Sequence, residues 1–218
     1  MNYLAHGYRF LDRPLFLAGT ALPDWLSVVN RRVRVRSRTT KPFLEAATSE
    51  DDRELAAGIL QHHADDDCFH RSETFMMLEA KLAASFRQQM PDPFDHRPGF
   101  LGHIVVELML DATLAARQPD LLDRFYQAMA EVPEQHVQRT VNRIAPVSTD
   151  RLAYVIGRFR DERFLYDYAA DESMRYRLNQ VMRRVRLPAL EPGVTSVLAE
   201  ARQVVNEHAN DLLQPVEQ

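Results

Sequence analysis

Three imidazoles and three carboxylates stand within ten positions of this chain, in the stretch Gln61-His62-His63-Ala64-Asp65-Asp66-Asp67-Cys68-Phe69-His70. The whole chain contains only eight histidines. Imidazole nitrogens and carboxylate oxygens are common ligands of divalent metal ions. The density of such groups therefore predicts a metal site.

A second polar set, His103, Glu107 and Asp111, recurs at every fourth residue. Residues four apart lie on one face of an α-helix, one turn above another. Most of their neighbours are apolar, so this helix is expected in the core, where unpaired polar groups would cost several kcal/mol. Two such helices facing each other would form a cage of nitrogen and oxygen ligands.

In the first stretch, His62, Asp66 and His70 share one face only if the helix continues past Ala64. Three consecutive aspartates are poor helix formers, and a break there would turn His63 or Asp67 inward instead. In a purely structural interpretation, the histidines complement a helix dipole and the aspartates cap the next helix. That interpretation does not explain the buried second set, so we favour the metal site.

A mixed site of histidine and aspartate fits a hydrolase. Carboxylates favour Mn²⁺ and Mg²⁺, and histidine widens the choice to Zn²⁺, Fe²⁺, Co²⁺ and Ni²⁺. Such an ion polarises a phosphoryl oxygen and lowers the pKa of water, so that hydroxide is available near neutral pH. The chain lacks paired Glu-x-x-His helices, a P-loop and a Gly-x-Ser-x-Gly turn. A helical iron oxygenase is thus only a third interpretation.

The elements that must position these residues are helices. Only seven glycines are scattered over 218 residues, and 45% of the residues are apolar, which suits an all-α, single-domain multi-helix bundle. We expect one domain over 1–218, with a metal-site half of about 1–116. Capping and proline signals predict helices from Thr48-Ser49 through His62, from Pro98 to Ala116, and over 120–130, 133–144, 149–168, 172–186 and 192–213.

Three shorter segments have distinct expectations. Residues 14–29 are expected to form a buried helix pair interrupted at Pro23 and Asp24, with Trp25 in its packing. Residues 90–98 contain three prolines and predict a loop that joins the two ligand-bearing helices. Alternating apolar and basic residues leave a strand over 32–36 open.

Composition sets limits on location and partners. No apolar run approaches the roughly 18 residues that cross a bilayer, and the single Cys68 excludes an intramolecular disulfide framework. We therefore expect a cytoplasmic protein without a membrane or nucleic-acid partner; the oligomeric state stays undetermined.

A basic segment stands out against a net charge of −4. Its cations could dock an acidic protein or a phosphate group. Equally, they could form a solvated loop in which they pair with the surplus carboxylates. The candidate partner-binding residues are Arg31, Arg32, Arg34, Arg36 and Arg38.

Three ordered blocks in the first half of the chain resemble the acyl carrier protein phosphodiesterases, relatives of the HD-domain metal-dependent phosphohydrolases. The blocks are Met1-Asn2-Tyr3-Leu4-Ala5-His6, Ala18-Gly19-Thr20-Ala21-Leu22-Pro23-Asp24-Trp25, and Ala57-Gly58-Ile59-Leu60-Gln61-His62 with Asp66 following. The helix around His103 and Glu107 is similar to one in which the family places Asp-x-x-x-Asp. Beyond Ala116 no diagnostic block follows.

The resemblance implies an HD-like helical fold, a favoured Mn²⁺ ion, and hydrolysis of the phosphodiester that joins 4′-phosphopantetheine to a serine of an acidic carrier protein. Asp24 and Asp66 are the expected catalytic carboxylates. The chain departs from the family in having His70, His103 and Glu107 where Asp or another acid is usual, and in lacking an adjacent His-Asp pair. The expected metal ligands are His6, Asp24, His62, Asp66, His70, His103 and Glu107, with His6 either a ligand or an outer group. The alternative is a non-catalytic helical binding protein with a residual polar site and a basic docking patch.

Overall fold

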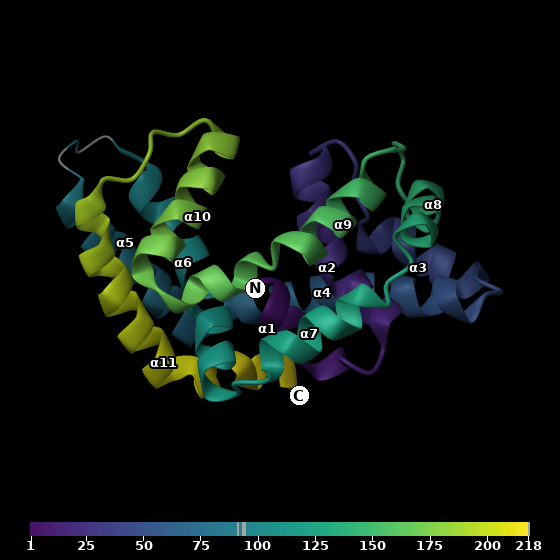
Figure 1. Cartoon of the computed structure of the whole chain (residues 1–218), viewed down its shortest axis with the longest axis horizontal. Coiled ribbons are helices and arrows are strands. Elements are labelled where there is room, and N and C mark those ends of the chain that lie inside the picture. The colour runs from purple at the N-terminus through teal and green to yellow at the C-terminus, as the bar shows by residue number, and fades with distance from the viewer. Residues whose placement is uncertain (91, 93–94, 218) are drawn as a thin grey trace. The chain divides into compact units, whose positions relative to one another are not determined.

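The chain is all-helical, as predicted, over the residues that the computed structural model describes, 1–90, 92 and 95–217 (Figure 1). The α-helices are α1 (Tyr3–Gly7), α2 (Pro14–Val29), α3 (Ser37–Ala46), α4 (Glu50–Arg71), α5 (Glu73–Gln89), α6 (Arg97–Arg117), α7 (Leu121–Ala130), α8 (Glu134–Ile144), α9 (Leu152–Glu162), α10 (Asp171–Val185) and α11 (Thr195–Glu217). Short 3-10 helices are η1 (Tyr8–Phe10), η2 (Phe164–Ala169) and η3 (Pro192–Val194).

The helices belong to two compact units, each assembled from separated stretches of the chain. Unit 1 contains Met1, Cys68–Pro119 and Phe164–Gln218, and unit 2 contains Asn2–Asp67 and Asp120–Arg163. Each unit therefore draws helices both from the first 116 residues and from the part of the chain after residue 120.

Helices α5, α6 and α11 pack together as the core of unit 1 (Figure 1). Gly102 of α6 lies so close to α5 that an added Cβ would be 2.5 Å from the carbonyl oxygen of Glu79. By length and composition α6 could cross a membrane, which the sequence analysis did not expect of any segment; 61% of its most apolar window is buried within the chain. A core helix passes the same test.

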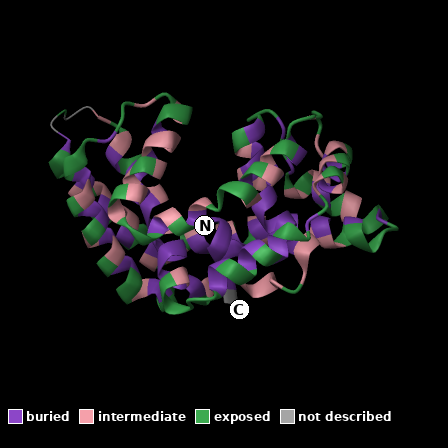
Figure 2. Cartoon of the chain, viewed as in Figure 1, coloured by how far each residue is buried: buried purple, intermediate pink, exposed green. Residues whose placement is uncertain are grey.

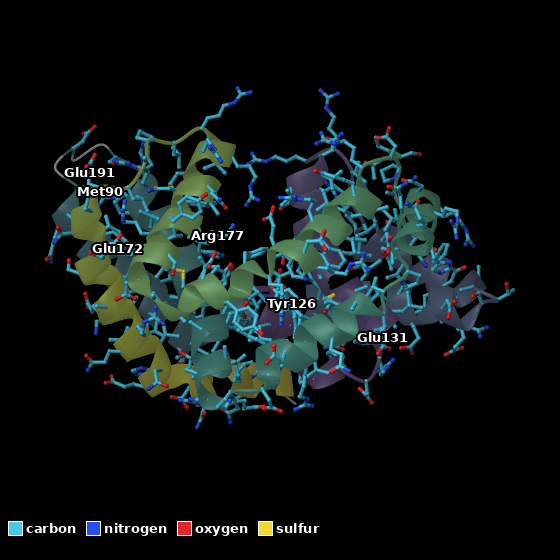
Figure 3. The ribbon with its side chains drawn as sticks, viewed as in Figure 1. Met90, Tyr126, Glu131, Glu172, Arg177 and Glu191 are labelled. Carbon is cyan, nitrogen blue, oxygen red and sulfur yellow. The ribbon has the colours of Figure 1, made fainter. Side chains whose placement is uncertain are left out.

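Helix α2 is the core of unit 2, where it packs against α1, α7 and α9. It is one helix with Pro23 inside, so the predicted helix pair is wrong. Most of its residues are buried (Figure 2). Trp25 meets the ring of Phe159 of α9 edge-on at 5.4 Å, and Tyr126 (Figure 3) lies 5.9 Å from the same ring.

Helix α4 continues without a break through the three aspartates to Arg71. Its first turn carries Glu50, Asp51 and Asp52, whose charges stabilise the positive end of the helix dipole. Because the helix continues, His62, Asp66 and His70 lie on one face, and the alternative with His63 and Asp67 turned inward does not occur.

Two connections differ from the sequence-based expectation. Helix α5, capped at its start by the Ser72 hydroxyl, which accepts a hydrogen bond from the amide of Phe75, separates the two ligand-bearing helices. The proline-rich segment 90–98, in which 91, 93 and 94 lie outside the described residues, therefore does not join them directly. The segment 32–36 is irregular and not a strand. The predicted helix over 149–168 ends early, because Arg163 takes a left-handed conformation with φ 42°.

Candidate metal centres

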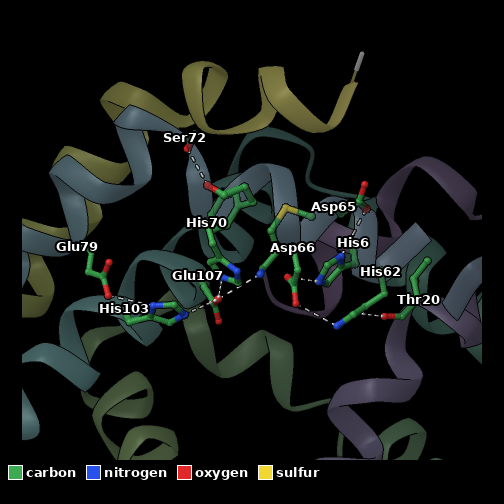
Figure 4. A network of polar contacts seen from close by, with 12 residues as sticks. His6, Thr20, His62, Asp65, Asp66, His70, Ser72, Glu79, His103 and Glu107 are labelled. Carbon is green, nitrogen blue, oxygen red and sulfur yellow. Dashed lines mark hydrogen bonds and ion pairs between the residues drawn. The ribbon is translucent and has the colours of Figure 1, made fainter. Parts of the chain in front are cut away.

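Three predicted ligands of unit 2 converge and form what we call the His62 group: His6 from α1 with His62 and Asp66 from α4 (Figure 4). One potential ligand atom of each residue lies within 4.8 Å of the others. The nitrogen His6 Nε2 is 3.2 Å from Asp66 Oδ1, and His62 Nε2 is 3.3 Å from Asp66 Oδ2. Both imidazoles therefore direct Nε2 towards one carboxylate.

The His62 ring is fixed by the backbone of α2. Its Nδ1 lies 2.7 Å from the carbonyl oxygen of Thr20. A carbonyl oxygen only accepts hydrogen bonds, so Nδ1 carries the proton and Nε2 is available as a ligand in the neutral ring. Metal-binding histidines are held in this way by an acceptor behind the ring.

The His6 ring is oriented in a similar way by Asp65, a carboxylate that the sequence analysis did not select. His6 Nδ1 is 3.5 Å from Asp65 Oδ2, and this buried oxygen also accepts a hydrogen bond from Arg9 at 2.6 Å. The other Asp65 oxygen accepts one from Gln61 at 2.7 Å. The rings of His6 and His62 stack with their centroids 4.1 Å apart.

The buried oxygen Asp24 Oδ2 has no hydrogen bond within the described chain. Asp24, near the end of α2, interacts electrostatically with His62 and His6. Burial raises the pKa of the Asp24 carboxyl above its usual range, and the two histidines offset only part of this rise. Unsatisfied buried groups are rare in folded proteins, and a cation bound beside Asp24 would satisfy this oxygen.

Charge in the His62 group is distributed unequally. Burial raises the pKa of Asp66, but hydrogen bonds from His6 and His62 lower it by more. The net result is a pKa well below the usual range of an aspartate. Burial lowers the pKa of His62, yet its hydrogen bond to Asp66 and the charge of Asp24 raise it more. Without a cation, Asp66 is thus the ionised carboxylate of the group, in contact with Nε2 of both His6 and His62.

Two glycines allow α2 and α4 to approach closely enough for this geometry. A Cβ on Gly58 would lie 2.1 Å from the carbonyl oxygen of Phe16, and one on Gly19 would lie 2.4 Å from that of Leu55. The helices therefore touch backbone to backbone. Next to this crossing, the Thr20 carbonyl contacts His62 of α4, and Asp24 interacts electrostatically with the same histidine.

The remaining three predicted ligands form a separate group in unit 1, which we call the His103 group: His70 at the end of α4 with His103 and Glu107 of α6 (Figure 4). The oxygen Glu107 Oε1 is 2.9 Å from His70 Nε2, 3.3 Å from His103 Nε2 and 3.1 Å from the amino group of Met1. Burial raises the pKa of Glu107, but these three groups lower it more.

Behind His103 stands a second carboxylate that the sequence analysis did not select. His103 Nδ1 lies 3.0 Å from Glu79 Oε1 of α5. The hydrogen bond to Glu107 raises the pKa of His103, burial opposes this, and Glu79 adds to the rise. Glu79 belongs to a helix whose apolar residues Phe75, Leu78, Leu82 and Phe86 recur at helical spacing, which is the pattern that could have revealed it.

Other predicted residues lie elsewhere. His63 bonds through Nε2 to the carbonyl oxygen of Val35 at 2.7 Å, and Asp67 is exposed. Asp111 is buried but outside both groups. Cys68 is exposed and forms no disulfide within the described chain.

Within the described part of the chain, the five arginines of the basic segment have no ion-pair partner, unlike Arg9, Arg13 and Arg143 of the same unit. Those three pair with Asp65, Glu54 and Asp52. Arg31, Arg32, Arg34 and Arg36 do lie exposed in a turn and irregular segment, as the solvated-loop interpretation expects, but the pairing with surplus carboxylates is not found among the described residues. Among the described residues no carboxylate lies within 4.0 Å of the cationic groups of Arg31, Arg32, Arg34, Arg36 and Arg38.

Comparison with known proteins adds no relative: no family model, curated protein or solved structure matches the chain.

Proposed function

We propose that the chain is a metal-dependent phosphodiesterase whose centre is the His62 group together with Asp24. The observation that carries this proposal is the convergence of His6, His62 and Asp66. Buried Asp24 interacts electrostatically with both histidines, and its Oδ2 has no hydrogen bond within the described chain. Two imidazoles and two carboxylates are a donor set for Mn²⁺ and related divalent ions, as in many hydrolases. The order of the sequence blocks around these residues supports the same activity.

A divalent ion held there would polarise a phosphoryl oxygen and make hydroxide available from water near neutral pH. The chain supplies the rest. Asp66 stays ionised, because its hydrogen bonds with His6 and His62 strongly lower its pKa. Asp24, whose pKa burial raises, is the stronger base of the two carboxylates. As long as it does not itself bind the ion, it is therefore the carboxylate that would accept the proton of the attacking water and return it to the leaving oxygen.

A pocket beside this centre supports an anionic substrate with an organic arm. Its volume is about 310 Å³. It adjoins the site through His63, whose ring centroid lies 5.5 Å from that of His62. Unpaired Arg34 and Arg36 contribute positive charge. The full lining is Pro23, Leu26, Val33, Arg34, Val35, Arg36 and His63. Such a mixture suits a phosphodiester group and an apolar chain, and the whole basic segment suits an acidic carrier protein.

The test is hydrolysis by the chelator-stripped chain after addition of Mn²⁺, Mg²⁺, Fe²⁺, Ni²⁺ or Zn²⁺. Bis-p-nitrophenyl phosphate reports general phosphodiesterase activity, and release of 4′-phosphopantetheine from a holo carrier protein reports the specific one. We expect Asp66→Asn and His62→Gln to lower kcat at least about 100-fold, a typical loss for acid-base and metal-site groups. His96→Gln, at an exposed position outside both groups, is the matched control.

Inactivity with every one of these ions on both substrates would refute the enzyme. The unpaired basic segment would then favour the alternative, a helical binding protein that docks an acidic partner. In that case carrier-protein binding would persist in Asp66→Asn, would weaken with salt, and would be lost when Arg34 and Arg36 are replaced by serine.

A further inference from the structure

We propose that the His103 group is a second cation site, separate from the proposed catalytic centre, and that it selects a nitrogen-preferring transition ion of the Zn²⁺ class. All of its members belong to unit 1, whereas the His62 group belongs to unit 2. The site consists of His70, His103 and Glu107, and Glu79 contacts His103 from behind.

Convergence of donors is the first reason. The Nε2 atoms of His70 and His103 lie 2.9 Å and 3.3 Å from the same oxygen of Glu107. Their rings are 4.8 Å apart and tilted by 31°. Three atoms from two helices thus surround one position at the spacing that a small cation would bridge. A carboxylate has about four lone-pair sites, so Glu107 can bind an ion and keep its contact with the Met1 amino group.

The second reason is that Glu79 orients the His103 ring from the side opposite the proposed ion. Glu79 accepts a hydrogen bond from His103 Nδ1 at 3.0 Å, so the proton stays on Nδ1 when Nε2 binds an ion. A carboxylate behind a histidine is the usual arrangement of a metal-binding imidazole, and it fixes both the tautomer and the ring direction. Gly102 supports it, since the close approach of α6 to α5 at this glycine brings Glu79 and His103 together.

Donor chemistry separates the two sites. Two imidazoles and one carboxylate form the His103 group, whereas the proposed catalytic centre has Asp24 as a second carboxylate beside the His62 group. Fewer oxygen donors disfavour Mg²⁺ and Mn²⁺, and imidazole favours Zn²⁺, Co²⁺ and Ni²⁺. The site ties the end of α4 to α5 and α6, so bound ion is expected to stabilise unit 1.

The test measures zinc binding by the full chain in which the proposed catalytic centre has been disabled by His62→Gln with Asp66→Asn. We expect equilibrium dialysis with metal analysis to find one Zn²⁺ per chain, bound far more tightly than Mg²⁺. Adding Glu107→Gln, which keeps the side-chain shape, should abolish this binding. Adding Glu79→Gln should weaken it about 10- to 100-fold, and His96→Gln should leave it unchanged.

A second readout does not depend on activity: Zn²⁺ should raise the melting temperature of the His62→Gln, Asp66→Asn chain, and Glu107→Gln should remove that rise. Absence of zinc binding in the folded double variant would overturn the proposal, and so would zinc binding that survives Glu107→Gln. Neither result depends on phosphodiesterase activity. If the wild-type chain is inactive but still binds this zinc ion, only the proposed phosphodiesterase activity is refuted.

Discussion

Replacing Gly58 with alanine tests whether the close crossing of α2 and α4 positions the His62 group. The added Cβ would lie 2.1 Å from the Phe16 carbonyl oxygen and 2.9 Å from the Gly19 Cα. An ordinary contact between carbon and oxygen needs at least about 3.3 Å. The two helices would therefore have to separate by about 1.2 Å at this point, because a backbone carbonyl cannot rotate away as a side chain can.

Two opposing terms set the expected magnitude. Alanine in a helix interior is favoured over glycine by about 1 kcal/mol, and overpacking a tight core costs about 1–3 kcal/mol. Since backbone is the obstacle here, we take the upper end, which leaves a net loss of about 2 kcal/mol in the free energy of unfolding. Gly157 is the matched control in α9, where the nearest atom to an added Cβ is the flexible Arg160 side chain at 3.9 Å. Gly157→Ala should therefore gain about 1 kcal/mol.

Denaturant unfolding followed by circular dichroism measures both variants in the metal-free chain. Metal titration and hydrolysis then measure the site, where a displacement of about 1 Å typically costs about 100-fold in rate. If Gly58→Ala is as stable as Gly157→Ala, the helices do not touch as described. If Gly58→Ala is destabilised but keeps full metal affinity, the crossing does not position the ligands.

Three further predictions concern Asp52, the pocket arginines and the pH dependence of metal binding. Asp52 accepts hydrogen bonds from Thr140 and Arg143 at 2.8 Å each, and these lower its pKa more than burial raises it. The ionised carboxylate therefore stabilises the fold above the unfolded pKa of about 4, and this contribution is lost as the pH falls through the folded pKa. Asp52→Asn should lower the free energy of unfolding by about 1–3 kcal/mol at neutral pH. In acid unfolding experiments the difference between the two chains should become progressively smaller. Replacing Arg34 and Arg36 together with serine should raise KM for an anionic diester by about tenfold with kcat unchanged, and added salt should reduce the difference; equal KM values would contradict a role for the pocket. Metal affinity of the centre should fall as the pH drops through the raised pKa of His62, because the ion must displace a proton, and calorimetry in buffers of different ionisation enthalpy would detect the released proton.

Periodicity in the sequence was enough to predict the helical fold and the helix faces that carry His62, Asp66, His103 and Glu107. It could not predict that His70 contacts Glu107 in one unit while Asp66 contacts His6 in the other. That division depends on how the chain passes between units, which has no local signal.

The carboxylates that contact the ligand histidines from behind, Asp65 and Glu79, were also hard to predict from local sequence. Asp65 and Asp67 are equivalent in type and differ only in helix phase, and phase could not be assigned while a break after Ala64 was open. Glu79 required recognition of α5, which the sequence analysis omitted although its apolar residues recur at helical spacing. Whether Arg34 and Arg36 are paired depends on tertiary contacts, so both interpretations of the basic segment had to stay open.

The hydrogen bond from His62 to the Thr20 carbonyl places a determinant of imidazole orientation in the main chain. Alanine scanning would therefore miss it, because every residue at position 20 presents a carbonyl oxygen. A neutral result for Thr20→Ala would report on the threonine hydroxyl, which donates to the Leu17 carbonyl, and not on the support of the histidine. Only a change to the backbone itself, such as an ester in place of the amide after Thr20, which weakens that carbonyl as an acceptor, would expose how strongly this ring depends on α2.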